Sequence, residues 1–379
     1  MSGKMTKCDQ IYNYILEFIA SNHLKKDDKI PTEVDLCEKF NVSRITVQGA
    51  IKQLQSEKKI YRIQGGGTYV GDIDSNHQPV IRNLSIIISH QANSFSLDII
   101  QGAQAYLSQI NYYLTVHISH KDELAERQIV TQLVENGAKC IMISPCASDV
   151  NNKFFFKLMQ QGINFIFIDN SMKSLPCNVV ESNNVMGGYN AGTYIAKNGY
   201  KNVAVFSIER IGMYDSLCER MEGLKMALDE HKITLDEAMI FECDNIIIGN
   251  MISAELHQKL EAMLVRPNRP DIIFALNDGT AIEILNYFNN HGISVPGEIS
   301  VMGFDNLQYS AHSNPPLTTM NQNFTEIGAE AAKLAVELIN DPDNRALTCK
   351  RIPVTLVERS STRDLKKMAS DISVDMSAG

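Results

Sequence analysis

Residues 32–54 read as two short amphipathic helices joined by a tight turn, and this pattern limits the folds open to the N-terminal region. Thr32 is a good helix N-cap, and Asp35 three residues later completes a loose capping box. Asn41 can adopt the left-handed conformation that ends the first helix. Ser43 then caps a second helix, whose predicted buried stripe is Val47, Ala50, Ile51 and Leu54. This layout predicts a helix-turn-helix.

The two helices have distinct faces. The apolar face of the first is predicted to hold Val34, Leu36, Cys37 and Phe40. The second leaves Arg44, Thr46 and Gln48 facing outward from its first turns. In a helix-turn-helix, the N-terminal residues of the second helix enter the DNA major groove. A plain helical hairpin with solvated polar side chains is the alternative that this stretch leaves open.

Residues 60–70 predict a two-stranded wing. The segment alternates like a strand, turns at three glycines and returns as a second strand. A bare glycine tip lets backbone N–H groups approach a phosphate or the minor groove closely. The glycines could also form a nucleotide-binding loop, but the Lys-Ser/Thr pair and the following helix that such a loop requires are missing.

Residues 10–70 resemble the winged helix-turn-helix of GntR-type bacterial repressors, and within that family its arabinose-repressor branch. The resemblance rests on the motifs Ile-Pro-Thr-Glu-Val-Asp-Leu, Val-Ser-Arg-Ile-Thr-Val and Gln-Gly-Gly-Gly-Thr-Tyr-Val. It implies binding to double-stranded operator DNA. The GntR pattern usually has Arg where this chain has Val34 and Gln48, so base preference is expected to differ, with Gln48 suited to adenine. The expected DNA-binding residues are Thr32, Glu33, Ser43, Arg44, Thr46, Gln48, Gln64, Gly65, Gly66 and Gly67.

Composition narrows the class of protein. A chain of 379 residues predicts two or three domains, and its net charge is −9. Residues 1–70 nevertheless hold 11 Lys/Arg against 8 Asp/Glu, so a mildly basic head precedes an acidic body. The eight cysteines include no Cys-x-x-Cys pair and no zinc-finger spacing, which favours reduced thiols, although a disulfide is possible. We expect a cytoplasmic protein without signal peptide, membrane span, metal or cofactor.

From Leu84 onward, short apolar runs alternate with helical patterns, which predicts an α/β body with buried parallel sheets in two lobes. Expected helices include residues 97–109, 122–136, 187–198, 279–291 and 325–340. Expected strands are residues 84–89, 113–119, 140–144, 165–169, 203–207, 272–276 and 300–303. The predicted domains are a DNA-binding domain at 1–70, a linker at 71–82, an effector domain at 83–365 and a disordered tail at 366–379.

Seven motifs in order make residues 84–363 resemble the effector-binding domain of the LacI family, which is akin to periplasmic sugar-binding proteins. The resemblance implies two Rossmann-like lobes, a type I periplasmic-binding-protein-like fold, joined by three crossover segments. We place the crossings near residues 181–183, 318–322 and 341–345. The motifs lie at residues 164–169, 182–188, 220–223, 274–278, 295–305, 316–322 and 358–363.

Ligands of parallel sheets bind beyond the carboxyl ends of the strands, where this chain has several polar residues. Carboxylates accept from sugar hydroxyls, Arg and Asn donate, and an aromatic ring covers the apolar face of a sugar. Asp169 and Asp305 could instead cap turns, Arg220 could pair with a glutamate on its own helix, and His90 could be a surface residue. The expected effector-binding residues are Ser89, His90, Phe95, Asp169, Arg220, Asn277, Asp305 and Gln322.

The combined resemblance predicts a transcriptional repressor that releases operator DNA when a small sugar binds. L-Arabinose is the effector that the resemblance implies; another pentose, a hexose, or a sugar acting as corepressor are the alternatives. An enzyme with an Asp278–Asp305 carboxylate pair, or a pure sugar-binding protein, fits the winged head poorly. A homodimer is expected because one head reads one half-site. The helix at 97–109 is a candidate dimer surface, although its apolar stripe could equally be core: Ile99, Ile100, Ala103 and Leu107.

Overall fold

The computed structural model of the chain consists of two compact units, residues 1–81 and 82–379. It describes residues 6–63, 66–71, 82–89, 94–146, 150–169, 172, 175–243, 254–341, 344 and 346–363. The predictions made for Gln64, Gly65, His90, most of the linker and the C-terminal tail fall outside these residues. All eight cysteines are free thiols, as their spacing predicts.

The first unit is a winged helix-turn-helix. Helices α1 (Lys7–Ser21), α2 (Glu33–Phe40) and α3 (Arg44–Ser56) precede the antiparallel strands β1 (Ile60–Ile63) and β2 (Gly67–Val70). The predicted capping box between Thr32 and Asp35 is present, and Asn41 adopts the left-handed conformation with φ 48°. The core of this unit contains the predicted stripe of α3 together with Ile11, Ile15, Leu36 and Ile60.

The predicted apolar face of α2 is wrong at one position. Val34 is 64% exposed, whereas Glu33 is buried. Because α2 begins at Glu33, the inward positions at helical spacing are 33, 36, 37 and 40, and Val34 turns toward solvent. A polar residue therefore occupies the inward position next to the cap.

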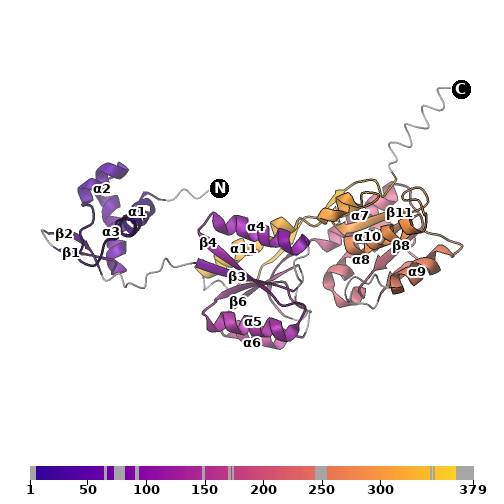
Figure 1. Cartoon of the computed structure of the whole chain (residues 1–379), viewed down its shortest axis with the longest axis horizontal. Helices are drawn as coiled ribbons and strands as arrows, with labels where there is room; N and C mark the ends of the chain where they lie inside the picture. Colours follow the sequence, from indigo (N-terminus) through magenta and orange to yellow (C-terminus); the bar gives the residue numbers. More distant parts are fainter. Residues whose placement is uncertain are drawn as a thin grey trace, which may run out of the picture. The chain divides into compact units, whose positions relative to one another are not determined.

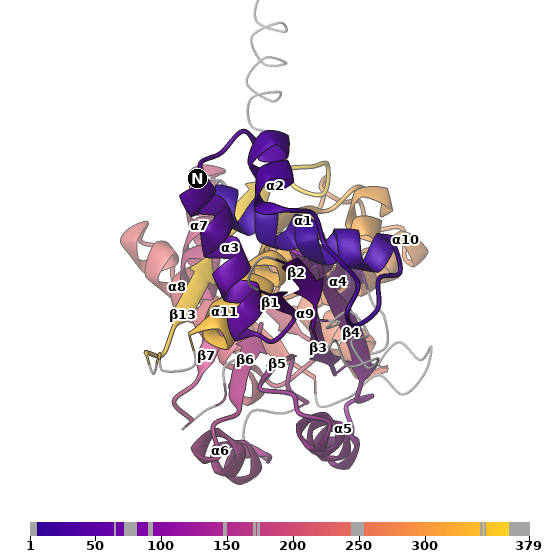
Figure 2. The same ribbon diagram turned by 90° about the vertical axis from the view of Figure 1, so that its left-hand side faces the viewer.

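The second unit contains two α/β lobes. The first lobe has an all-parallel sheet in the order β13-β7-β6-β5-β3-β4. Helices α4 (Ser94–Ser108) and α11 (Phe324–Asn340) cover one face, and α5 (Glu123–Glu135) and α6 (Asn152–Gln160) cover the other (Figures 1 and 2). The strands are β3 (Arg82–Ile88), β4 (Tyr112–Ile118), β5 (Cys140–Ile143), β6 (Asn164–Ile168), β7 (Asn178–Ser182) and β13 (Cys349–Ile352).

The second lobe repeats this plan. Its sheet has the order β14-β12-β11-β10-β8-β9 and is parallel except for β14. Helices α7 (Asn184–Lys197) and α8 (Asp215–Glu230) pack together over one face, while α9 (Ala254–Leu264) and α10 (Asp278–Asn290) cover the other. The strands are β8 (Val203–Ser207), β9 (Ile240–Glu242), β10 (Ile272–Ala275), β11 (Ser300–Asp305), β12 (Thr318–Asn321) and β14 (Thr355–Val357). The predicted α/β class and its two lobes are confirmed.

The chain passes between the lobes three times. The first crossing follows β7 and the second follows β12, close to the predicted segments at 181–183 and 318–322. The third prediction, residues 341–345, is wrong. That segment joins α11 to β13, which both belong to the first lobe, and the crossing comes later at residues 353–354 between β13 and β14.

Paired glycines bring two helices into close contact in each lobe. In the first lobe, a Cβ added at Gly102 of α4 would lie 1.8 Å from the carbonyl oxygen of Thr325, and one at Gly328 of α11 would lie 1.9 Å from that of Ile99. In the second lobe, Gly188 of α7 and Gly223 of α8 make the same kind of reciprocal contact with backbone oxygens. Each pair of helices therefore packs backbone against backbone.

Candidate functional sites

A buried carboxylate organises the outer surface of the head. Oε2 of Glu33 accepts from Nε of Arg44 at 2.7 Å and from Nε2 of Gln48 at 3.4 Å. Its Oε1 pairs with Nη1 of Arg62 at 2.9 Å. The hydrogen bond from Arg44 lowers the pKa of Glu33. One carboxylate thus ties together the first turn of α2, the first turns of α3 and the wing strand β1.

The other predicted DNA-binding residues border this cluster. Thr32 caps α2, and the hydroxyls of Ser43 and Thr46 lie 3.2 Å apart at the start of α3. Ser43 is the N-cap of α3 by position, but its side chain makes no capping bond. Gly67 has a φ of 124°, and a Cβ there would meet Cε of Lys29 at 2.7 Å, so the wing turn requires a glycine.

Ile45 is the most exposed large apolar side chain of the head, with an exposed fraction of 81%. It occupies the second position of α3, next to Arg44, so it shares the surface that the helix-turn-helix pattern assigns to DNA. The outward set predicted from the sequence contains only polar residues and omits it. The burial phase of α3 is the signal that finds it, because Val47 and Ala50 face inward and Ile45 lies on the opposite side.

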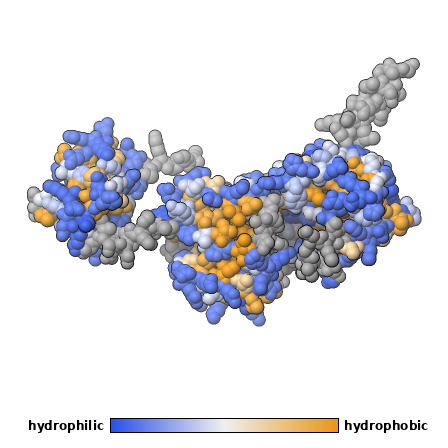
Figure 3. Space-filling model, viewed as in Figure 1, coloured by the Kyte–Doolittle hydropathy of each residue, from blue (hydrophilic) through white to orange (hydrophobic). Residues whose placement is uncertain are grey.

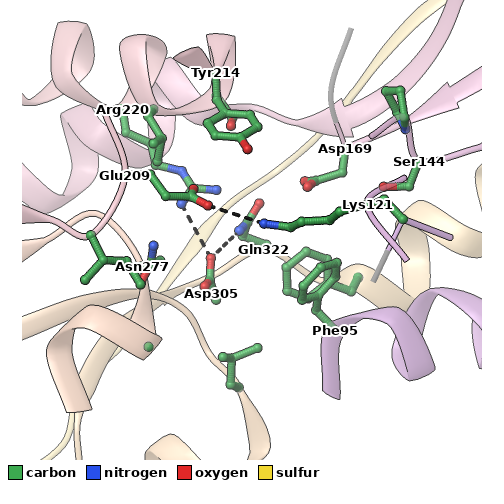
Figure 4. A pocket seen from close by; sticks show the side chains of 18 of the residues that line it. Phe95, Lys121, Ser144, Asp169, Glu209, Tyr214, Arg220, Asn277, Asp305 and Gln322 are labelled. Carbon is green, nitrogen blue, oxygen red and sulfur yellow. Dashed lines mark hydrogen bonds and ion pairs between the residues drawn. The ribbon is translucent and has the colours of Figure 1, made fainter. Parts of the chain in front are cut away.

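The second unit has a polar cavity between its two lobes, with a volume of about 240 Å³ (Figure 4). Every described residue of the predicted effector set lines it. All of them lie at a strand end, at a helix start or in a crossing segment, except Arg220, which lies in the second turn of α8. From the first lobe come Ser89, Phe95 and Asp169; from the second come Arg220, Asn277 and Asp305; Gln322 lies in the second crossing.

Arg220 is the most heavily engaged cation of the cavity. Its Nε donates to Oδ1 of Asn184 at 3.0 Å, and its Nη1 donates to the carbonyl oxygen of Leu276 at 2.5 Å. Nη1 also lies 3.5 Å from Oδ1 of Asp305, and the guanidinium stacks over the ring of Phe304. Arg220 therefore does not pair with a neighbour on its own helix, and the alternative reading of this residue is wrong.

Asp305 ends β11 in a strained conformation, with a φ of 133°. It accepts from Nε2 of Gln322 at 2.5 Å. Burial raises the pKa of Asp305 to about 8, although the Arg220 guanidinium acts in the opposite direction. Oε1 of Gln322 is buried without a hydrogen-bond partner among the described residues, so it offers an acceptor to a ligand hydroxyl.

The remaining predicted residues have varied roles. Oδ1 of Asn277 caps α10 by accepting from the backbone N–H of Thr280 at 2.8 Å. The ring of Phe95 packs against that of Phe324, with centroids 5.4 Å apart. Asp169 has a φ of 70°, and burial raises its pKa. Figure 4 shows Asp169 and Phe95 on the side of the cavity opposite Arg220.

The predicted effector set omits an ion pair that spans the lobes. Nζ of Lys121 lies 3.7 Å from Oε1 of Glu209, and both residues line the cavity. Lys121 extends across the cavity in Figure 4. Lys121 follows β4 and Glu209 follows β8, so the strand-end rule could have found both. Tyr214 and Phe324 add aromatic surface.

Asp278 is not part of this cavity. Its carboxylate accepts from the hydroxyls of Ser310 and Thr319 at 2.5 Å each and from the backbone of Leu307 at 2.9 Å. These contacts hold the loop that contains Leu307 and Ser310. Only Asp305 of the Asp278–Asp305 pair lines the cavity, so the two carboxylates do not form the catalytic pair that the sequence left open. Within the described residues, no cluster of His, Cys, Asp and Glu could hold a metal ion, and no helix is long and apolar enough to cross a membrane.

Comparison with known families agrees with both halves of the chain. Residues 7–70 match the bacterial regulatory proteins of the gntR family, and residues 193–362 match the periplasmic binding protein-like domain. The chain thus combines a gntR-family DNA-binding domain with a periplasmic binding protein-like domain. Both resemblances predicted from sequence motifs are thereby confirmed.

Two relatives match most of this chain and most of their own length. The arabinose metabolism transcriptional repressor of Geobacillus stearothermophilus is 25% identical over 94% of this chain and 97% of its own length. Its namesake from Halalkalibacterium halodurans is 28% identical over 87% of each chain. A LacI family transcriptional regulator from Enterococcus faecium, solved with bound ribose, has a TM-score of 0.61 and 24% identity, and it covers 74% of this chain and 98% of its own. This structural likeness shows the fold of the body.

Proposed function

We propose that this GntR-type regulator is a repressor whose operator binding responds to a small sugar. The observation that carries the proposal is the presence, in one chain, of a winged helix-turn-helix and of a cavity with charged and polar side chains between two lobes. A ligand that contacts both lobes favours their closed arrangement in proportion to its differential affinity. In this proposal the winged helix-turn-helix binds DNA, and the cavity between the lobes binds the small molecule.

The charges of the cavity favour a neutral ligand. Arg220 lies beside Asp305, and Lys121 lies beside Glu209, so each cation already has an acidic side chain as its neighbour. Asp169 adds a further acid. A ligand carrying a carboxylate or phosphate would have to displace one of these partners, whereas sugar hydroxyls can donate to the carboxylates and accept from Arg220.

We assign the role of effector to a neutral monosaccharide, with L-arabinose as the first candidate. Support comes from the names of two relatives that match most of the chain, both described as arabinose metabolism repressors. Another pentose and a hexose are the alternatives. In this assignment Asp305, Asn277 and Gln322 bind hydroxyls, and the rings of Phe95 and Tyr214 cover the apolar face of the sugar.

A homodimer is part of the proposal, because one recognition helix reads one half-site of a palindromic operator. The stripe of α4 predicted as a dimer surface is core, since Ile99, Ala103 and Leu107 are fully buried. Strand β4 offers a different surface, because it is the edge of its sheet. Figure 3 shows a hydrophobic patch over this lobe between α4 and α5. The exposed apolar side chains of β4 and of the adjoining helices α4 and α5 are Leu97, Tyr113, Val116, Ile118 and Leu124.

Two measurements test the proposed function. Calorimetric titration of the full chain with a panel of L-arabinose, D-ribose, D-xylose, D-glucose and D-glucuronate should give binding to a neutral sugar and none to the uronate. Operator affinity is then measured with and without the saturating sugar. We expect weaker operator binding with sugar; tighter binding would reverse the inducer assignment to corepressor, and unchanged binding would overturn the switch.

Reciprocity provides an internal check of this switch. Because the coupling free energy belongs to both ligands, operator DNA must weaken sugar affinity by the same factor by which sugar weakens operator affinity. Sugar titrations in the presence and absence of saturating operator measure that factor independently. Unequal factors would mean that the two binding sites are not linked in the way proposed.

A further inference from the structure

We infer that Ile45 reads the 5-methyl group of a thymine in the operator; this inference rests on the proposed DNA-binding function. The starting observation is its exposure. A large apolar side chain that is 81% exposed stands at the second position of the recognition helix, between Arg44 and Thr46. Single exposed apolar residues are common on protein surfaces, so the argument depends on where this one lies.

Ile45 follows Arg44, and the carboxylate of Glu33 binds Arg44. Glu33 binds Arg44 of α3 and Arg62 of the wing, and these two arginines keep 69% and 45% of their side chains exposed. The ends of three elements are thereby held together around one point. The two exposed arginines make this surface attractive to phosphates, and Ile45 stands on the same first turn as one of them.

Further exposed apolar side chains stand next to members of the cluster in the chain. Val34 is 64% exposed beside Glu33 in α2, and Ile63 is 48% exposed beside Arg62 in β1. Each exposed apolar residue is thus a chain neighbour of a member of the Glu33 cluster. Among these residues Ile45 alone lies in the first turn of α3, the part of a helix-turn-helix that enters the major groove.

Only one group in the major groove makes a favourable apolar contact with an aliphatic side chain. Thymine alone carries a methyl group there, while the other base edges present donors and acceptors that isoleucine cannot satisfy. Isoleucine is also β-branched and strongly prefers one χ1 rotamer in a helix, so its reach into the groove is defined. Ile45 should therefore require a thymine at one position of each half-site and disfavour cytosine there, which lacks the methyl group.

The test replaces single thymines by deoxyuridine, which removes only the methyl group. Operator duplexes are first recovered from a random-sequence pool with the full chain. Each thymine of a half-site is then replaced in turn, and affinity is measured for the unmodified chain, for Ile45→Ala and for Gln53→Ala. Gln53 is an exposed residue of the same helix and serves as the matched control. Because Ile45 is exposed, its truncation should leave the fold intact, which circular dichroism checks.

We expect one thymine per half-site at which loss of the methyl weakens binding about fourfold, the value for burying one such group. Ile45→Ala should be insensitive to the replacement at that position, and Gln53→Ala should keep the full effect. Equal sensitivity of the unmodified chain and Ile45→Ala at every thymine would overturn the inference. A change in oligomeric state of Ile45→Ala with unaltered DNA affinity would also overturn it, by assigning the residue to a protein contact. If no sequence is enriched from the pool, the proposed DNA-binding function itself fails.

Discussion

Nε of Arg44 and Oε2 of Glu33 are 2.7 Å apart, across the turn that joins α2 to α3. This contact engages Nε, so the two Nη nitrogens of Arg44 remain for an acceptor outside the protein. A paired pattern of acceptors is what the major-groove edge of guanine presents. The carboxylate therefore orients a cation without occupying the atoms best suited to read a base.

Arg44→Ala should weaken operator binding by about 1–3 kcal/mol and relax the preference for the contacted base, because a bidentate contact is lost. Fluorescence anisotropy with the selected operator and with single-base variants measures both effects. Lys25→Ala, which removes a charge from the exposed loop after α1, is the control and should change affinity far less. Unchanged operator affinity in Arg44→Ala would mean that α3 is misassigned as the recognition helix.

Asp305→Asn and Arg220→Lys should leave operator affinity intact and abolish its response to sugar. Both residues line the interlobe cavity, and each change removes a group that we assign to hydroxyl recognition. In cells this combination gives permanent repression. Lys225→Ala, on the exposed face of the same helix as Arg220, should respond to sugar normally. Operator titrations with and without sugar decide the point, and a normal response in either cavity variant contradicts it.

Asp305 should also make the sugar-free protein less stable as pH rises. Burial raises the pKa of Asp305 to about 8, whereas an unfolded Asp titrates at about 3.9. The unfolded state therefore loses this proton at lower pH than the folded state. The contribution of the group to stability is complete below about pH 4 and is lost as pH rises toward 8.

Thermal unfolding of sugar-free protein between pH 5 and about pH 9 tests this linkage. Asp305→Asn should be increasingly more stable than the unmodified chain as pH rises, with the difference levelling off above the folded pKa. Asp229→Asn, on the exposed face of α8, should show no such trend. A difference that shrinks with rising pH would mean that Asp305 is ionised and well paired in the empty cavity.

Tyr113→Asp and Val116→Asp should convert a dimer into a monomer, because each places a charge on the apolar edge strand β4. Sedimentation at micromolar concentration reads the oligomeric state, and operator titration should show the loss of avidity for a palindrome. Val265→Asp is the matched control, since Val265 is 82% exposed in the other lobe. A dimer that survives both β4 substitutions would place the interface elsewhere.

Gly328→Ala should destabilise the body by about 3 kcal/mol, the upper end of the usual range for overpacking, because the added Cβ meets the carbonyl oxygen of Ile99 at 1.9 Å. Gly212→Ala is the control, since no atom lies within 4 Å of a Cβ at that position. The midpoint of thermal unfolding of the full chain measures both. Equal midpoints would show that α4 and α11 can move apart at little cost.

Sequence patterns were sufficient for the fold class and for most of the cavity, because buried strands and strand-end polar residues have local signatures. They were insufficient where helical phase or strand order decides the outcome. The apolar pattern predicts that Val34 faces inward, and only the start of α2 at Glu33 shows that it faces solvent. The third crossing could not be placed without knowing that β13 belongs to the sheet of the first lobe. Lys121 and Glu209 each follow a strand that the sequence predicts, but their ion pair depends on how the two lobes meet.

The reciprocal glycine contacts have a genetic consequence. A single nucleotide change converts any glycine codon into an alanine codon, and at Gly102, Gly188, Gly223 and Gly328 that change puts a methyl group into a backbone carbonyl. Alleles of this kind force packed helices apart, and they would reduce the amount of folded protein. A screen for constitutive expression should therefore recover, alongside head mutants, temperature-sensitive alleles at these four codons, and growth at low temperature should restore both repression and induction.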